Sequence, residues 1–315
     1  MENSRRYDII CIGTAIVDSI IRGFDPAPVS ASGYRAEEGT LNAGGEAVNE
    51  AMAAAKLGLS TGILCFTGND AAGRIILDAL QGPGVDTSLV LLSEKHHTPV
   101  TTMFVNNDGT RRSITNHSHK YNFHPERYIS CFSHTKAVIL GSLFRAPFDD
   151  PEIIDQVLRA ARENNVVVFA DTKLPNFHFL KLQDISASIP LIDYLTPNED
   201  EARYYSGKEQ PEDMADVFLD AGVGNVIIKL GSRGCYFKNN TRSFYLPAFP
   251  ITPVDATGAG DNFIAGFASE ILRGGEVYDA LLFANACGAI CTTAAGAGTA
   301  LKNRCQVLDF LKNRI

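Results

Sequence analysis

The sequence has no long apolar run, and none of its stretches approaches the ~20 residues that a membrane-spanning helix needs. At the N-terminus, the apolar part of MENSRRYDIICIG is too short and too early for a signal peptide and instead predicts a first strand. The 7 cysteines are odd in number and include no C-x-x-C pair. They indicate reduced core thiols, so we expect a cytoplasmic protein with no membrane partner.

Positive charge is also scarce. The chain carries 28 Lys and Arg against 36 Asp and Glu, which gives a formal net charge of -8. Because a phosphate backbone requires a basic surface, this balance argues against broad nucleic-acid binding, while a local basic pocket is still allowed. Hydrophobic residues at 45% and charged residues at 20% are ordinary for a globular protein and argue against a disordered chain.

Familiar glycine motifs are missing where they would be expected. No G-x-G-x-x-G follows the first predicted strand, which disfavours a dinucleotide-dependent oxidoreductase. The glycine-rich stretch DATGAGD at 255–261 has no G-K followed by Ser or Thr, so it is not a Walker A loop, and Phe263 stands where a Rossmann fingerprint would need glycine. A phosphate site in this stretch must therefore use another arrangement.

What the sequence does contain is an alternation of short β-branched runs with helical patterns. Strands are expected at 7–13, 61–66, 137–142, 166–171, 194–198 and 225–231, and helices near 46–58, 71–80, 151–164, 199–206, 211–221, 261–273 and 277–293. Continuous apolar strands separated by helices predict a mostly parallel central sheet covered on both faces, a three-layer α/β/α fold. We find no interdomain linker and expect a single domain over residues 1–315.

Two stretches, about 15–40 and 97–116, interrupt this alternation. They show period-two patterning and turn signals without a helix, and the second contains the hairpin signal NNDGT. We interpret the pair as a small antiparallel sheet that projects from the main domain. Such a lid could close over a substrate.

The segment DATGAGDNFIAGF, residues 255–267, holds the chemistry-bearing motif. From Phe263 onward the apolar spacing is helical, which places Asp261 at or just inside a helix N-terminus, where it could simply be a cap. Residues without Cβ let backbone approach a ligand, and N–H groups at a helix start bind anions. Gly258, Ala259 and Gly260 would then hold phosphate beside the Asp261 carboxylate, which suits phosphoryl transfer to a hydroxyl group.

At this point the sequence resembles the ribokinase-like (PfkB) family of sugar and nucleoside kinases. The family's C-terminal signature has the form D-T-x-G-A-G-D, and residues 255–261 match it except for Ala256, where Thr is common. The resemblance implies a ribokinase-like fold with a β lid, ATP and Mg²⁺, Asp261 as the catalytic base and the amides of Gly258, Ala259 and Gly260 as the anion hole. We also expect a homodimer formed through the lid, because exposed strand edges and apolar faces tend to be buried against a partner.

The resemblance implies substrate contacts near the N-terminus. GGEAVNEAMAAAKLG at 44–58 is similar to the family's Gly-Gly and Asn motif, so Gly44 and Gly45 would let a polyhydroxylated ligand approach backbone and Asn49 would bond its hydroxyl groups. Asp18, in GTAIVDSI, matches the aspartate that accepts bonds from sugar hydroxyls. From the residues alone, a turn, a helical Asn and an exposed Asp are the plainer alternatives.

Further positions resemble the family's nucleotide and metal sites. In TPNEDEA the motif N-x-x-E gives Asn198 and Glu201, with Glu201 acting on Mg²⁺ through water, although an N-capped acidic helix start explains the pattern equally well. In IIKLGSRG the resemblance points to Lys229 and Gly231 along the nucleotide. By the same resemblance, Asn285 and Gly288 would line the adenine pocket, although a helix face of small residues more often serves packing alone.

Some relatives also bind a monovalent cation beside the anion hole. By resemblance its ligands would be Asp255, Thr257 and carbonyl groups of the segment AAGAGTA at 294–300. Potassium is therefore a candidate second cation.

The acceptor is the least determined part of this prediction. Glu46 stands where relatives that act on sugar phosphates, and some that act on free sugars, have Lys. Its charge would repel a substrate phosphate, which favours an unphosphorylated sugar or a nucleoside. Arg111, with Arg112, could bind a carboxylate, so a sugar acid such as 2-keto-3-deoxygluconate is an alternative. We predict a kinase for a hydroxymethyl group, and a non-catalytic sugar or nucleotide sensor on the same fold is the alternative of another class.

Overall fold

A sheet of eight strands forms the centre of the computed structural model, which describes residues 6–23, 36–106, 111–116, 123–176 and 178–314. Its strands, in chain order, are β1 (Tyr7–Ile12), β4 (Thr61–Leu64), β9 (Thr135–Leu143), β10 (Val167–Thr172), β11 (Tyr194–Leu195), β12 (Asn225–Lys229), β13 (Cys235–Asn239) and β14 (Ser243–Leu246). In space the order is β14-β13-β12-β11-β10-β9-β1-β4. Pairing is parallel from β4 to β12, and β13 and β14 add an antiparallel edge.

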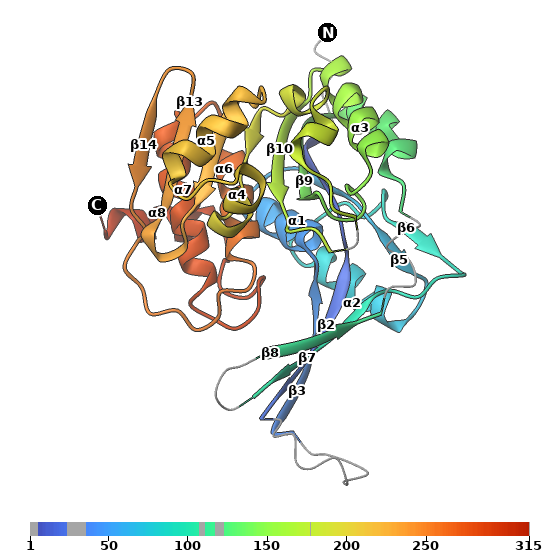
Figure 1. The fold of residues 1–315 in the computed structure, drawn as a ribbon. Coiled ribbons are helices and arrows are strands. Elements are labelled where there is room, and N and C mark those ends of the chain that lie inside the picture. The colour runs from blue at the N-terminus through green and yellow to red at the C-terminus, as the bar shows by residue number, and fades with distance from the viewer. Residues whose placement is uncertain (1–5, 24–35, 107–110, 117–122, 177, 315) are drawn as a thin grey trace.

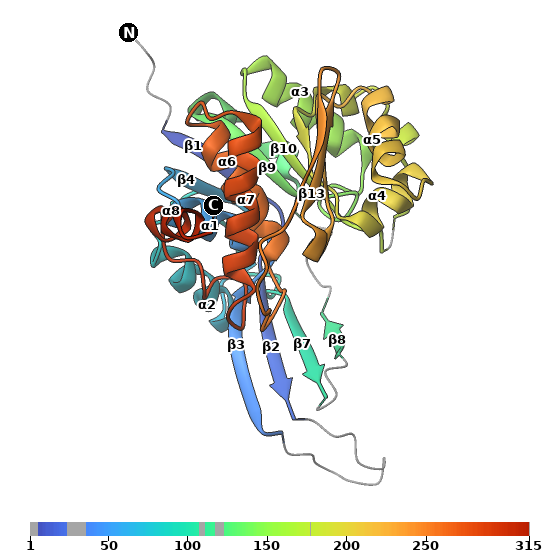
Figure 2. The same ribbon diagram turned by 90° about the vertical axis from the view of Figure 1, so that its left-hand side faces the viewer.

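Helices cover both faces of this sheet (Figure 2). They are α1 (Glu46–Lys56), α2 (Ala71–Gln81), α3 (Pro151–Glu163), α4 (Glu199–Ser206), α5 (Pro211–Asp220), α6 (Ala259–Ile271), α7 (Val277–Cys291) and α8 (Arg304–Lys312). Strand β1 shows how the layers form, because its side chains alternate between two cores. Ile9 and Cys11 join the core of α1, α2, α6, α7 and α8, whereas Ile10 and Ile12 join that of α3, α4 and α5. The predicted three-layer fold is confirmed.

A second sheet projects from the body as the predicted lid (Figure 1). Its strands are β2 (Ile16–Arg22), β3 (Glu38–Gly44), β7 (Val100–Val105) and β8 (Arg111–Thr115), in the order β3-β2-β7-β8. The prediction of a wholly antiparallel lid is wrong, because β2 and β7 pair in parallel. Local turn signals reveal hairpins, whereas this central pairing joins strands far apart in the chain. The predicted lid residues 24–35 and the tip 107–110 lie outside the described residues.

The register of the lid separates two kinds of surface. Asp18 lies beside Asn42 on one side and Thr101 on the other, so these polar residues share a face. The next row, on the opposite face, runs from Leu41 through Ser19 and Thr102 to Ile114. Leu41 is 58% exposed and Ile114 is 70% exposed, so this face presents apolar side chains to solvent.

Several elements were not predicted or have different limits. Helix α8 and the edge strands β13 and β14 were missed, a third small sheet joins β5 (Phe66–Gly68) to β6 (Leu91–Ser93), and α6 begins at Ala259, two residues earlier than expected. Across the described part of the chain, no helix combines the length and apolar character needed to cross a membrane.

Candidate active site

A pocket of about 710 Å³ lies where the carboxyl ends of the parallel strands meet the start of α6 and the lid. In open α/β sheets this end of the strands is where ligands bind, and the volume suits small-molecule ligands. The predicted site residues that line the pocket are Asp18, Gly45, Asn49, Asn198, Glu201, Lys229, Gly231, Thr257, Gly258, Ala259, Gly260, Asp261, Asn285 and Gly288. Segments far apart in the sequence therefore meet in one cavity.

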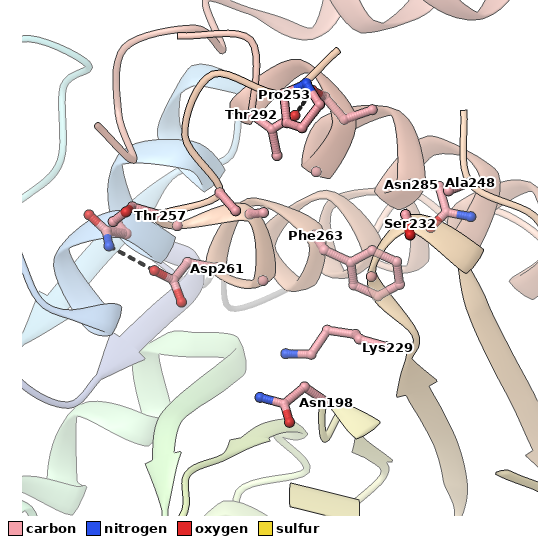
Figure 3. Close-up of a pocket in the computed structure, with 18 of the residues that line it drawn as sticks. Asn198, Lys229, Ser232, Ala248, Pro253, Thr257, Asp261, Phe263, Asn285 and Thr292 are labelled. Atoms are coloured by element: carbon pink, nitrogen blue, oxygen red, sulfur yellow. Dashed lines mark hydrogen bonds between the residues drawn. The ribbon is translucent and has the colours of Figure 1, made fainter. Parts of the chain in front are cut away.

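Asp261 lies in the first turn of α6, and its position is fixed by a neighbouring helix. Its Oδ2 accepts a hydrogen bond of 2.7 Å from Nδ2 of Asn49 on α1 (Figure 3). The plain interpretation of Asp261 as the helix cap is not borne out: Gly258 occupies the cap position, and no side-chain capping bond is found there. Burial raises the pKa of the Asp261 carboxyl, while Lys173 and the Asn49 bond oppose the rise. A raised pKa makes Asp261 a better proton acceptor.

The glycine loop before Asp261 has a backbone that glycine alone adopts without strain. Gly258 has a φ of 76°, and a Cβ there would lie 2.1 Å from Cβ of Ala297. Asn262 holds the loop in place, since its Nδ2 donates to the carbonyl oxygens of Gly258 at 2.8 Å and of Ala297 at 3.0 Å. The start of α6 therefore borders the pocket at a fixed position, and of its amides that of Ala259 already donates to the Ala256 carbonyl oxygen at 3.2 Å.

The predicted monovalent-cation ligands lie together behind this loop. Oδ1 of Asp255 accepts bonds from the Thr257 amide at 3.0 Å and from Thr257 Oγ1 at 2.7 Å, and its Oδ2 accepts from the Gly296 amide at 3.1 Å. Asp255 is buried and, unlike Thr257, is not among the residues that line the pocket. Its immediate role in the structure is to join the signature to the segment 294–300.

The glycine pair before α1 makes room for neighbouring groups. Gly45 has a φ of 94°, and a Cβ there would lie 2.4 Å from the Thr14 carbonyl oxygen. A Cβ at Gly44 would lie 2.3 Å from Oδ2 of Asp18, so Gly44, which does not line the pocket, leaves space for that carboxyl group. Burial raises the pKa of Asp18 to about 6. Arg111 belongs to β8, opposite Val105, and its side chain lies outside the described part of the structure.

Glu46 is held at the same end of the pocket. Its Oε1 accepts bonds from the Thr14 amide at 3.0 Å and from Thr14 Oγ1 at 2.7 Å, and Ser142 Oγ also donates to it. With Asp18 and Asp261 it makes the acceptor end of the pocket acidic.

Cationic and capping groups occupy the other side of the pocket. Nζ of Lys229 donates to Oδ1 and Oδ2 of Asp171 at 2.7 and 2.6 Å and points toward Asp261 across the cavity (Figure 3). Asn198 and Glu201 form a capping box at the start of α4: Oδ1 of Asn198 accepts from the Glu201 amide, and Glu201 Oε2 accepts from the Asn198 amide, each at 2.9 Å. Because both residues also line the pocket, the capping interpretation and the functional one are compatible.

The remaining predicted nucleotide residues lie further from Asp261 along the pocket. Gly231 has a φ of 61° in the turn after β12, and Asn285 Nδ2 donates to the Pro247 carbonyl oxygen at 3.3 Å. Gly288 follows one turn later on α7. Phe249, from a loop that sequence reasoning did not single out, contributes an apolar surface to the same region.

Two acidic residues and a lysine near the pocket were not among the predicted site residues. Asp171 ends the predicted strand VVVFAD, so its place at the carboxyl end of a parallel strand could have identified it. Lys173, which follows the same strand, also lines the pocket. Burial lowers the pKa of Lys173, but Asp261, Asp171, Glu46 and Glu201 outweigh that effect and raise it. Glu50 of α1 lies beneath the pocket, fully buried, and no sequence signal marked it.

Comparison with known proteins gives a consistent result. The profile of the family described as pfkB family carbohydrate kinase matches residues 7–304. Ribokinase of Haemophilus influenzae is 28% identical over 278 residues, which cover 86% of this chain and 87% of the relative. 2-Dehydro-3-deoxygluconokinase of Bacillus subtilis is 29% identical over 281 residues, which cover 84% of each chain.

Among solved structures, Arabidopsis thaliana ribokinase complexed with ribose and ATP superposes with a TM-score of 0.85 at 26% identity, covering 97% of this chain and 99% of that chain. The match spans the main sheet and the lid, as the predicted ribokinase-like fold requires. With its signature loop, strand order and lid, the chain belongs to the PfkB family of carbohydrate kinases, which are ATP-dependent phosphotransferases.

Proposed function

We propose that this protein transfers the γ-phosphoryl group of ATP to a hydroxymethyl group of an unphosphorylated sugar, and that residues 1–315 act as one domain. The observation that carries the proposal is the position of Asp261. Its carboxylate lies in the first turn of α6, beside the helix N-terminus, and in the same pocket as Asp18 and Asn49. A proton acceptor, an anion site and hydroxyl-binding groups are the parts that this reaction needs.

The residues of the pocket fit a magnesium nucleotide. Carboxylate oxygen is a preferred donor for Mg²⁺, and Glu201 offers it on the side of the pocket opposite the lid, with Lys229 nearby. Gly258, Ala259 and Gly260 line the pocket at the N-terminus of α6, where phosphate oxygens would lie. When bound, Mg²⁺ neutralises charge on the transferring phosphate. Asn198, Gly231, Asn285 and Gly288 would hold the rest of the nucleotide.

The chain's own groups account for the movement of the proton. A bond forms between the acceptor hydroxyl oxygen and the γ-phosphorus, the bond from that phosphorus to the oxygen of the departing ADP breaks, and the hydroxyl proton passes to Asp261. The Asn49 amide and the positive charge of Lys173 hold the Asp261 carboxylate for this transfer. The amides from Gly258 to Gly260 stabilise the negative charge on the phosphoryl group.

Charge in the acceptor region favours an uncharged substrate. Asp18, Glu46 and Asp261 bring carboxylates to this end, and Glu46 is held in place by Thr14 and Ser142. A phosphate or carboxylate on the substrate would meet these groups. A sugar acid is the second candidate, because a 2-dehydro-3-deoxygluconokinase is among the relatives and Lys173 lies in the pocket.

We further propose that a monovalent cation such as K⁺ lies near Asp255 and Thr257, where it would stabilise the anion site.

A coupled ADP-release assay tests the proposed reaction. It would compare free sugars, nucleosides, sugar acids and sugar phosphates, with Mg²⁺ and K⁺ present. We expect turnover with one or more uncharged sugars, and a loss of kcat of about 10²- to 10⁴-fold in Asp261→Asn, because the variant keeps the shape of the side chain but cannot accept a proton. Asp279→Asn is the matched control, since Asp279 lies in the first turn of the neighbouring helix α7 and is exposed.

Other outcomes would contradict the proposal. Unchanged kcat in Asp261→Asn would refute the mechanism. Binding of a sugar or nucleotide without ADP release for any class would favour the non-catalytic sensor. Preferred turnover of a sugar acid would replace the neutral acceptor by the second candidate while leaving the mechanism intact.

A further inference from the structure

Glu50 on α1 is a buried acidic residue that the proposed reaction does not use. Its side chain is 0% exposed, and neither carboxylate oxygen has a hydrogen-bond partner among the residues that the structure describes. Buried carboxylates in proteins are normally paired or hydrogen-bonded, because an isolated buried charge is very costly. Glu50 therefore needs another explanation.

The neighbours of Glu50 are the acidic residues of the site. One carboxylate oxygen of Glu50, one of Asp171 and one of Asp261 all lie within 4.8 Å of one another. Asp171 is paired with Lys229, and Asp261 accepts the Asn49 amide. Two of the three carboxylates thus have hydrogen-bonded partners, and within the described residues Glu50 has no hydrogen-bond partner.

The fold leaves space for this side chain. Gly141 on β9 faces α1, and a Cβ there would lie 2.8 Å from Oε2 of Glu50 and 2.5 Å from Cγ of Glu46. A strand residue without a side chain is therefore required where the two glutamates of α1 meet the sheet. Glu50 occupies a site that is shaped for it.

The charged and titratable groups around Glu50 come from every element packed against it. They are Asp261 on α6, Asp171 and Lys173 at the end of β10, Glu46 on α1 and Cys11 on β1. Burial, followed by the charges of Asp261, Asp171 and Glu46, raises the pKa of Glu50 well above its ordinary value, and Lys173 opposes this. Cys11 is fully buried, and its own pKa is raised by burial and by Glu50, so it carries no charge that could stabilise an ionised Glu50.

We propose that Glu50 keeps a proton at neutral pH and acts as a positioning residue, a neutral carboxylic acid that limits the negative charge beneath Asp261 so that a phosphoryl group can approach. The proposal rests on the proposed kinase reaction for its catalytic consequence. Ionisation of Glu50 would add a negative charge within 4.8 Å of the base and disfavour the approach of the phosphate. Activity should then fall as the pH rises through the range in which Glu50 loses its proton.

A bound cation is the other way to satisfy three carboxylates, and the contacts disfavour it. Lys229 already donates to both oxygens of Asp171, and the Asn49 amide occupies Oδ2 of Asp261. A cation at this position would also compete for the oxygen atoms that must accept the substrate proton. A proton on Glu50 requires none of these contacts to break.

The variant Glu50→Gln tests the proposal, because its amide is uncharged and has the shape of the protonated carboxyl group. We expect kcat/KM at pH 7 within about threefold of the wild type, an unchanged acid limb of the pH profile, and loss of the alkaline decline. Glu50→Met, which is apolar and of similar length, should give the same profile if the Gln variant folds poorly. Glu126→Gln is the matched control, because Glu126 also has a buried oxygen without a partner among the described residues, but it does not belong to the group of carboxylates formed with Asp171 and Asp261.

Two measurements that need no turnover separate this proposal from the proposed function. The folded-state pKa is raised, so the contribution of Glu50 to stability is lost as the pH rises through that pKa. The melting temperature of the wild type should therefore fall relative to that of Glu50→Gln at alkaline pH. Infrared difference spectra of the ligand-free protein at pH 7 should show a protonated-carboxyl band that Glu50→Gln lacks.

Three results would overturn the inference. A shift of the acid limb to lower pH in Glu50→Gln would mean that Glu50 is ionised at neutral pH and already raises the pKa of Asp261. Absence of the infrared band in the wild type would mean the same. A rise in melting temperature with Mg²⁺ or Mn²⁺ alone, present in the wild type and absent from Glu50→Gln, would show that the three carboxylates hold a metal ion.

Discussion

Asp18 brings a carboxyl group from the lid to the proposed acceptor end of the pocket. Its pKa is raised, so its charge changes close to physiological pH. Burial raises this pKa to about 6, and Asn42 and Thr101 lie beside it on the same face of the lid. A carboxylate can accept two hydroxyl bonds, whereas the protonated form loses part of that capacity. Acceptor affinity should therefore depend on pH through this residue.

The prediction is that KM for the sugar rises as the pH falls below about 6, by about tenfold per unit once Asp18 is mostly protonated. Asp18→Asn should have a high KM with little pH dependence in this range. Because the folded-state pKa is raised, the wild type loses stability as the pH rises through about 6, and Asp18→Asn should remove that loss in thermal melts.

Asp149→Asn is the control for this experiment. Asp149 is also buried, and burial raises its pKa, but it does not line the pocket. Its replacement should leave KM and its pH dependence unchanged. A KM that is flat from pH 5 to pH 8 in the wild type would contradict the assigned role of Asp18.

Single residues were predictable where a linear motif carries them. Short motifs pointed to Asp261, Asn49 and the glycine loop, and the structure brings these residues into one pocket, while their roles stay predictions. Asp171 and Glu50 were not predictable in this way, since their importance comes from neighbours far apart in the chain. A strand-end Asp and a helical Glu look ordinary until the fold brings them together.

At the scale of elements, the start of α6 combines helix geometry with a tight contact. Gly258 precedes the helix with a φ of 76°, against the segment 294–300, and Asn262 ties the two together. The anion site therefore depends on a turn that admits no side chain.

Gly258→Ala should lower both stability and activity. A non-glycine residue in this backbone region costs about 1–2 kcal/mol, and the added Cβ would also lie 2.1 Å from Cβ of Ala297, which must move. Gly274→Ala is the matched control, because Gly274 has a φ of 81° and no atom within 4 Å of an added Cβ. Urea unfolding should show a larger loss of unfolding free energy for Gly258→Ala, and kcat/KM should fall in that variant alone.

Equal losses in the two variants would contradict the role given to the contact with Ala297.

Among the elements themselves, buried strands and amphipathic helices were predictable because one face or both must be apolar. The edge strands β13 and β14 were missed, because their pairing with each other and with β12 depends on the tertiary structure, which local sequence periodicity does not reveal. The parallel pairing of β2 and β7 was missed for the same reason.

At the scale of the whole molecule, one face of the lid presents apolar side chains that the described residues leave exposed. Leu41 and Ile114 lie in one row across the four strands and are 58% and 70% exposed. The opposite face carries Asp18, which lines the pocket. We propose that the lid of a second copy covers the apolar row in a homodimer.

The double variant Leu41→Asp with Ile114→Asp should shift the protein from dimer to monomer in multi-angle light scattering at micromolar concentration. Charged side chains in the row would have to be desolvated at the interface, which is unfavourable. Leu92→Asp is the control, since Leu92 is 54% exposed on β6, outside the lid. A monomeric wild type, or a dimer that persists in the double variant, would contradict the proposed interface.

The attachment of the lid has a mechanical consequence. The lid strand β2 follows β1 through Thr14, and the lid strand β3 leads into α1 through Gly45. These two connections are joined by the hydrogen bonds from Thr14 to Glu46. If Asp18 binds the sugar as proposed, we expect binding to act on both connections, and through α1 on Asn49 and Asp261. The lid is thus connected to Asp261 through α1. A label on an outer strand of the lid should therefore report whether the pocket is occupied, although the label does not contact the pocket.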